Sequence, residues 1–141
     1  VIVHPGALKE DTRANARKRA IAMLREALAE TESGRIIYEN TAGSPQLLGR
    51  DFDETAELIE KTGGPKRLGL CIDTCHMHAT GYDVRTPEGV AEIADEIEAK
   101  VGLEQLRALH VNDSRDARGS NRATSGRRMA GGAFNHASTS A

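Results

Sequence analysis

Four short apolar runs recur along the chain, and three of them lead into a segment with the apolar spacing of a helix. The runs predict buried strands, because they lack the polar alternation of a half-exposed sheet. We expect these strands at residues 1–4, 35–40, 67–73 and 106–111. The alternation of strand and helix, with the last helix missing, predicts a parallel α/β sheet.

The segments between the strands carry helix signals. An apolar stripe predicts a helix over residues 12–32. Asp51 is placed to cap the next helix, with Glu54 three residues on in a capping-box-like arrangement. Thr86 is placed to cap another helix, with Pro87 in the first turn where proline is favoured. Residues 74–85 read as a long loop or a short helix.

The strand ends deliver side chains that can bind a metal. His4, Glu39, Asp73 and His110 each stand at the end of a predicted strand. The carboxyl ends of parallel strands gather at one face of the sheet, where active sites lie. Imidazole and carboxylate are ligands that zinc and manganese accept in catalytic sites, and the two oxygens of Glu39 could bridge two metals. The alternative is that each residue caps a strand or bonds to a loop backbone.

Other polar residues near these ends have two interpretations each. His76 follows Asp73 by three residues and could bind a further metal or hydrogen-bond the loop. His78 forms an H-x-H pair with His76, but we expect no metal role for it. Asn112 and Asp113 are expected to order the loop or to orient ligands.

The two cysteines, Cys71 and Cys75, could be thiolate ligands, but a cysteine in a buried strand more often simply packs. Two cysteines do not make a disulfide scaffold, so a reduced, cytoplasmic setting is expected. No apolar run reaches membrane-spanning length, and no signal peptide is visible.

The charge is unevenly distributed. The net charge is −2, which argues against a generally basic nucleic-acid binder. Residues 114–141 carry five arginines and one acid, a local charge of +4, so residues 1–113 sum to −6. A nucleic-acid binder could still use a local basic patch or bound cations.

The last part of the chain, from about residue 121, has no periodicity and is rich in Gly, Ala, Ser and Thr. We predict a domain over residues 1–122 and an aberrant or disordered tail over residues 123–141. Because Val1 already lies inside a strand pattern, we interpret the chain as a fragment of a longer protein.

Four motifs stand at the predicted strand ends: Val3–Gly6 (VHPG), Glu39–Gly43 (ENTAG), Cys71–His76 (CIDTCH) with Gly81–Asp83 (GYD), and His110–Ser114 (HVNDS). Together they resemble the endonuclease IV family of DNA base excision repair, whose members are deoxyribonuclease IV-type apurinic/apyrimidinic (AP) endonucleases. The resemblance covers residues 1 to about 122, and the order and spacing of the motifs are specific.

The resemblance implies a TIM-type (β/α) barrel, of which this chain supplies about four strand-helix units, and three zinc ions, with manganese as a possible substitute. It implies hydrolysis of the phosphodiester 5′ to an abasic site in double-stranded DNA, giving a 3′-hydroxyl and a 5′-deoxyribose phosphate, by a monomeric protein. By position, His4 would bind the first zinc, Glu39 would bridge the first two and be catalytic, Asp73 and His110 would bind the second, and His76 the third.

The chain also departs from the family pattern. Ala123, Thr124 and Ser125 stand where an Asp-x-His pair is expected, and the family's first three strands and its last strand with a further glutamate are absent. We therefore expect the chain to be inactive on its own. A second function class stays open, because sugar isomerases and epimerases of xylose isomerase-like barrels use similar strand-end ligands with one or two divalent metals.

Overall fold

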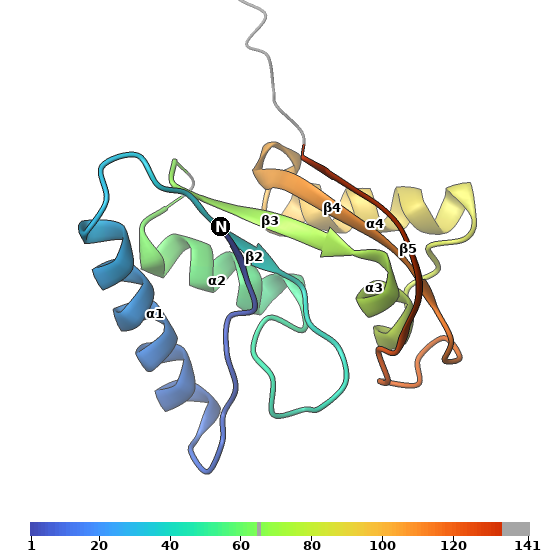
Figure 1. The fold of residues 1–141 in the computed structure, drawn as a ribbon, viewed down its shortest axis with the longest axis horizontal. Helices are drawn as coiled ribbons and strands as arrows, with labels where there is room; N and C mark the ends of the chain where they lie inside the picture. The colour runs from blue at the N-terminus through green and yellow to red at the C-terminus, as the bar shows by residue number, and fades with distance from the viewer. Residues whose placement is uncertain (65, 134–141) are drawn as a thin grey trace, which may run out of the picture.

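The computed structural model describes residues 1–64 and 66–133 as one five-stranded sheet with helices packed against it (Figure 1). The spatial order of the strands follows the chain. The first four strands are parallel, and the fifth is antiparallel to the fourth. The strands are β1 (Ile2–Val3), β2 (Ile36–Glu39), β3 (Leu68–Asp73), β4 (Leu106–Ser114) and β5 (Ser125–Ala133).

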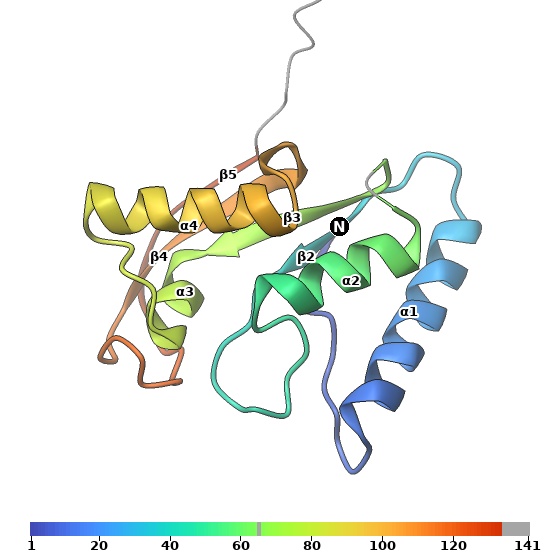
Figure 2. The ribbon, with the colours of Figure 1, turned by 180° about the vertical axis from the view of Figure 1, so that it is seen from behind.

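The four α-helices are α1 (Arg13–Ala29), α2 (Phe52–Thr62), α3 (Thr74–Thr80) and α4 (Pro87–Lys100), and a 3-10 turn, Leu103–Gln105, leads into β4. Figure 2 shows α1, α2 and α4 lying together on one side of the sheet. The predicted parallel α/β arrangement is therefore confirmed. Among the residues that the structure describes, no helix is both long and apolar enough to cross a membrane.

Each long helix begins at a side-chain cap. The hydroxyl of Thr12 accepts a hydrogen bond from the backbone amide of Asn15 at the start of α1. Asp51 and Thr86 cap α2 and α4 in the same way, as the sequence predicted. The capping box of α2 is only half formed, because the Glu54 carboxylate accepts from the Gly49 amide rather than from the amide of Asp51. These caps fix the residue at which each loop ends and its helix begins.

Most of the core lies between the helices and the facing side of the sheet, in two adjoining clusters, and a third cluster joins α1 to the loops after β1 and β2 through Leu8, Ala16, Ala20 and Leu48. Its aliphatic character follows from a sequence with 3% aromatic residues. One cluster joins α1 and α2 to β2 and β3, and contains Leu24, Leu28, Ile36, Tyr38, Leu58, Ile59 and Leu68. The other joins the first turn of α2, α3 and α4 to β3, and contains Phe52, Leu70, Ile72, Met77, Ile93 and Ile97. Burial of these side chains holds the strands in register and so fixes the positions of the strand ends.

Strand β5 is the main difference from the sequence prediction. It lies within the segment for which we predicted a tail without regular structure, and it pairs along β4 from Ser114 with Ser125 to Ala108 with Ala133. Strand pairing uses backbone groups that every residue except proline offers, so a segment without an apolar pattern can still pair along a strand edge. The rest of that predicted tail, residues 134–141, lies outside the described residues, and the domain boundary at residue 122 stays a prediction.

Candidate metal centre

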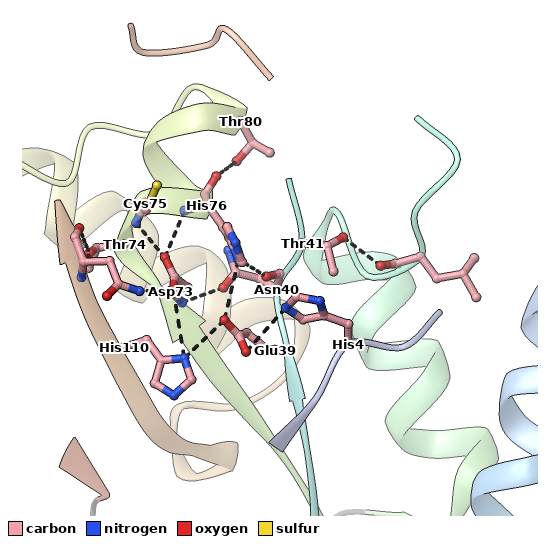
Figure 3. A network of polar contacts seen from close by, with 12 residues as sticks. His4, Glu39, Asn40, Thr41, Asp73, Thr74, Cys75, His76, Thr80 and His110 are labelled. Carbon is pink, nitrogen blue, oxygen red and sulfur yellow. Dashed lines mark hydrogen bonds and ion pairs between the residues drawn. The ribbon is translucent and has the colours of Figure 1, made fainter. Parts of the chain in front are cut away.

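All five predicted ligands lie at or beside the edge of the sheet where the parallel strands β2 and β3 end. Glu39 and Asp73 are the last residues of β2 and β3, His4 follows β1 directly, and His110 lies in β4 beside Asp73. His76 lies on the first turns of α3, which begins directly after β3. Figure 3 shows the side chains of His4, His76 and His110 pointing toward Glu39. The fold therefore brings together residues that are up to 106 positions apart, from His4 to His110.

Glu39 is at the centre of this cluster. Its Oε2 lies 3.5 Å from Nε2 of His4. Its Oε1 lies 3.1 Å from Nδ1 of His110 and 3.7 Å from Nδ1 of His76. Only 11% of the Glu39 side chain is exposed, so these imidazoles rather than water are its main polar neighbours. The two oxygens thus face different partners, as a bridging carboxylate requires.

The spacing of the donor atoms fits a divalent metal. Ligand atoms at the usual zinc distance of about 2.0–2.1 Å lie roughly 3.3–3.4 Å apart in a tetrahedral site. The described residues contain two groups of three in which the donor atoms all lie within 4.8 Å of one another: His4 with Glu39 and His76, and Glu39 with Asp73 and His110. Both groups contain Glu39. That these residues bind metal stays a prediction.

Asp73 has a structural role as well as a candidate ligand role. Its Oδ1 accepts hydrogen bonds from the backbone amides of Cys75 (2.8 Å) and His76 (3.1 Å), so it caps α3. Its Oδ2 lies 4.0 Å from Nδ1 of His110 and accepts from the side-chain amide of Asn112. The alternative interpretation, in which a strand-end residue bonds to the backbone, is therefore correct for Oδ1 of Asp73. The other oxygen, Oδ2, faces His110.

Asn40 was missed as a site residue by the sequence reasoning. Its side-chain oxygen accepts from the Asp73 amide at 2.6 Å, and its backbone oxygen lies 2.7 Å from Nδ1 of His76. A carbonyl oxygen can only accept, so Nδ1 of His76 carries the proton and Nε2 is the nitrogen left for a metal. The signal was available, since Asn40 follows Glu39 directly at a strand end.

The tautomer of His76 bears on where this histidine would bind. The resemblance placed His76 at a third metal, apart from the pair that Glu39 bridges. In the structure its Nδ1 faces Asn40 and Glu39, and its ring lies 5.6 Å from that of His4, centroid to centroid. A metal bound at Nε2 would leave the Asn40 contact intact, which fits a separate position for this ion.

The segment expected to supply Asp-x-His adopts another structure. Thr124 hydrogen-bonds through its backbone to Asp116 and Arg115, and Ser125 begins β5. Its loop is held against α3 by the amides of Gly119 and Asn121, which donate to His78 and Ala79 carbonyls. The loop thus packs on the end of α3 without adding a metal-binding side chain among the described residues.

The two cysteines are buried and free. Cys71 is fully buried in β3, and burial, together with the charges of Glu39 and Asp73, raises its pKa to about 12. Burial also raises the pKa of Cys75, which lies in α3. Thiols in this state are poor nucleophiles and poor metal ligands, so the packing interpretation is favoured for both.

His78 and Asp113 belong to neither group of donor atoms. His78 lies on α3, and its backbone oxygen accepts from Gly81 and Gly119 at the end of that helix. Gly81 has a φ of +112°, a conformation that suits glycine and ends α3 sharply. Asp113 accepts a hydrogen bond from the amide of Ser114, which fits the loop-ordering role expected for it.

Comparison with known proteins gives a consistent result. The model of the family described as xylose isomerase-like TIM barrel matches residues 1–138. A probable endonuclease 4 of Campylobacter curvus (strain 525.92) is 44% identical over 111 residues, which are 78% of this chain and 39% of that protein.

Two solved structures are also similar. Endonuclease IV from Thermus thermophilus superposes with a TM-score of 0.71 and 35% identity, over 89% of this chain and 43% of that one. A structure described as AsfvAP:AG has a TM-score of 0.63 over 89% of this chain and 41% of that one, but at 19% identity it shows the fold alone. The chain therefore spans about two fifths of the length of these relatives. It belongs to the xylose isomerase-like TIM barrel family, and its resemblance to endonuclease IV is confirmed by both sequence and structure.

Proposed function

We propose that this chain carries part of the metal centre of a DNA repair endonuclease, which hydrolyses the phosphodiester 5′ to abasic sites in double-stranded DNA. One observation carries the proposal: Glu39 belongs to both groups of ligand atoms, with Oε2 toward His4 and Oε1 toward His110. The names of the relatives at 44% and 35% identity, probable endonuclease 4 and endonuclease IV, support the nuclease over a sugar isomerase of the same barrel family.

The donor set indicates which metals fit. Three imidazoles with two carboxylates suit zinc, and manganese is compatible with the same ligands. His4 would hold one ion, Asp73 with His110 a second and His76 a third, with Glu39 shared between the first two. Bound divalent ions supply positive charge against the anionic phosphodiester and lower the pKa of bound water, so that hydroxide is available near neutral pH.

The protein residues position and orient groups around this chemistry. Glu39 sets the spacing between the two ligand groups, because its carboxylate lies on a strand paired on both sides. The backbone of Asn40 fixes the His76 ring, and Asp73 is fixed by the start of α3. Cys71 and Cys75 are buried, so no cysteine nucleophile is offered at this face. Metal-supplied charge is also in keeping with a chain whose net charge is −2.

The test uses residues 1–122 of this chain in place of the matching segment of the Thermus thermophilus enzyme, because the chain spans only 43% of that protein. We expect the chimera to nick a duplex that contains one abasic-site analogue and to hold zinc, as measured by gel assay and elemental analysis. Glu39→Gln removes one charge and one ligand oxygen, so both nicking and metal content should fall sharply.

Glu57→Gln is the matched control, because Glu57 lies on α2 and pairs with Arg17 and Lys61 away from the site. A folded chimera that binds zinc but does not nick would refute the nuclease proposal. Full nicking by the Glu39→Gln chimera would refute the bridging role.

A further inference from the structure

Asp73 has two oxygens with separate tasks, and the second depends on Asn112. The Oδ1 atom accepts from two amides of α3, which fixes the plane of the carboxylate. The Oδ2 atom faces His110 and accepts from the Nδ2 group of Asn112. With Asp73 only 3% exposed, water contributes little to its orientation. The direction of the remaining lone pair of Oδ2 is therefore set by protein groups.

Asn112 is itself held in place from outside the site. Its backbone amide donates to Oγ1 of Thr74 at 2.9 Å, and that hydroxyl donates back to the Asn112 carbonyl at 2.7 Å. These reciprocal bonds tie the end of β4 to the first residue of α3. Asn112 is two residues from His110 on the same strand, so both side chains project to the same face. The amide therefore reaches Asp73 from the side where His110 also lies.

We propose that Asn112 is a positioning residue that orients Oδ2 of Asp73 for binding one metal ion through a single oxygen. The inference rests on the proposed function only in that it requires a divalent metal at Asp73 and His110. The amide occupies one lone pair of Oδ2 and Oδ1 is engaged by α3, so the carboxylate presents one free direction. An amide is suited to this role because it donates without adding charge next to two carboxylates.

The expected effect follows from how ligand-orienting groups act elsewhere. Replacing a group that hydrogen-bonds to a metal ligand typically lowers metal affinity about 10- to 100-fold. Asn112→Leu keeps a similar volume and removes the donor, so this loss is expected for it. Asn112→Gln keeps an amide on a longer side chain and should recover part of the affinity. A residue with a merely structural role would not show this recovery.

The experiment is a titration of the metal-free 141-residue chain with Co²⁺ and Zn²⁺. Calorimetry measures the affinity, and the Co²⁺ absorption bands report the ligand geometry. Asn15→Ala is the matched control, because the side-chain amide of Asn15 on α1 donates to the carboxylate of Asp11 at 2.9 Å, outside both groups of ligand atoms. Thermal unfolding in EDTA reports whether each variant folds. If Asn112→Leu does not fold, Thr74→Val releases the backbone of Asn112 and is expected to weaken binding as well.

Weaker metal binding by Asn112→Leu, with altered Co²⁺ absorption bands and with unchanged binding by Asn15→Ala, supports the positioning role. Equal affinity in Asn112→Leu and the unmodified chain would overturn it while leaving the proposed function intact. Absence of metal binding by the unmodified chain would overturn both the metal centre and the role of Asn112. Loss of affinity in Asn112→Leu without any change in the Co²⁺ absorption bands of the saturated protein would also count against an effect on ligand geometry.

Discussion

Replacing Asp73 in two ways should separate its role in capping α3 from its role in metal binding. Asparagine caps helices about as well as aspartate, so Asp73→Asn keeps an acceptor for the amides of Cys75 and His76. Asp73→Ala removes it, which costs about 1 kcal/mol for the cap. It also leaves the Asn112 amide without its acceptor, which costs about 1 kcal/mol more. In EDTA we expect Asp73→Ala to lose about 2 kcal/mol and Asp73→Asn about 1 kcal/mol, because the asparagine oxygen keeps the cap but its amide nitrogen cannot accept from Asn112.

Metal should widen the difference in stability between Asp73→Asn and the unmodified chain. At a free metal concentration about 100 times the dissociation constant, binding stabilises a protein by about 2.7 kcal/mol. If Asp73→Asn weakens binding about 100-fold, the same concentration stabilises that variant by only about 0.4 kcal/mol. Urea unfolding followed by circular dichroism, with EDTA and with Zn²⁺, measures both quantities on the same samples.

Two results would refute this reasoning. If Asp73→Asn loses as much stability in EDTA as Asp73→Ala, the cap is not the structural role of Asp73. If Asp73→Asn is stabilised by Zn²⁺ as strongly as the unmodified chain, Asp73 is not a ligand. Asp51→Ala serves as the control, because Asp51 caps α2 away from the metal centre. It should cost about 1 kcal/mol in EDTA and leave the metal effect unchanged.

Two further predictions concern buried groups. Burial and the hydrogen bond to Glu96 raise the pKa of Tyr82 to about 12, whereas the unfolded side chain titrates near 10. The stabilisation that this neutral phenol provides is complete below pH 10 and is lost as the pH rises toward 12. Tyr82→Phe should therefore show a smaller fall in the urea midpoint over that range than the unmodified chain. An equal fall would contradict the assignment. Cys71 and Cys75 are buried with raised pKa values, so iodoacetamide should label neither in the native chain at pH 8 and both in urea, as mass spectrometry would detect; rapid native labelling would show that this region opens.

The parallel part of the fold could be predicted from the sequence because its signals are local. Asp51 and Thr86 cap helices where expected, and β3 follows its apolar run. The predicted helix over residues 12–32 ends earlier, at Ala29, since backbone bonds to Leu28 and Glu26 close its last turn before Ser33 and Gly34. Strand β5 could not be predicted, because its pairing depends on the edge of β4 rather than on its own residue pattern.

The candidate site was predictable as a set of residues and not as a network. Strand-end positions identified Glu39 and His110, and the parallel topology explains why they meet. The sequence could not show that Asn40 serves two partners through its side chain and its backbone, because that depends on the distance between β2 and α3. Hydrogen-bond partners follow from packing, and packing is set by residues far apart in the chain.

The reversed direction of β5 has a consequence for the order in which the sheet forms. The parallel strands are joined by long crossovers, residues 4–35, 40–67 and 74–105, whereas β4 and β5 are joined by residues 115–124 alone. Closing the shorter loop costs about 1 kcal/mol less entropy. The β4–β5 hairpin is therefore expected to be among the first long pairings to form during folding, with His110 in place before the strands that carry His4 and Glu39 arrive.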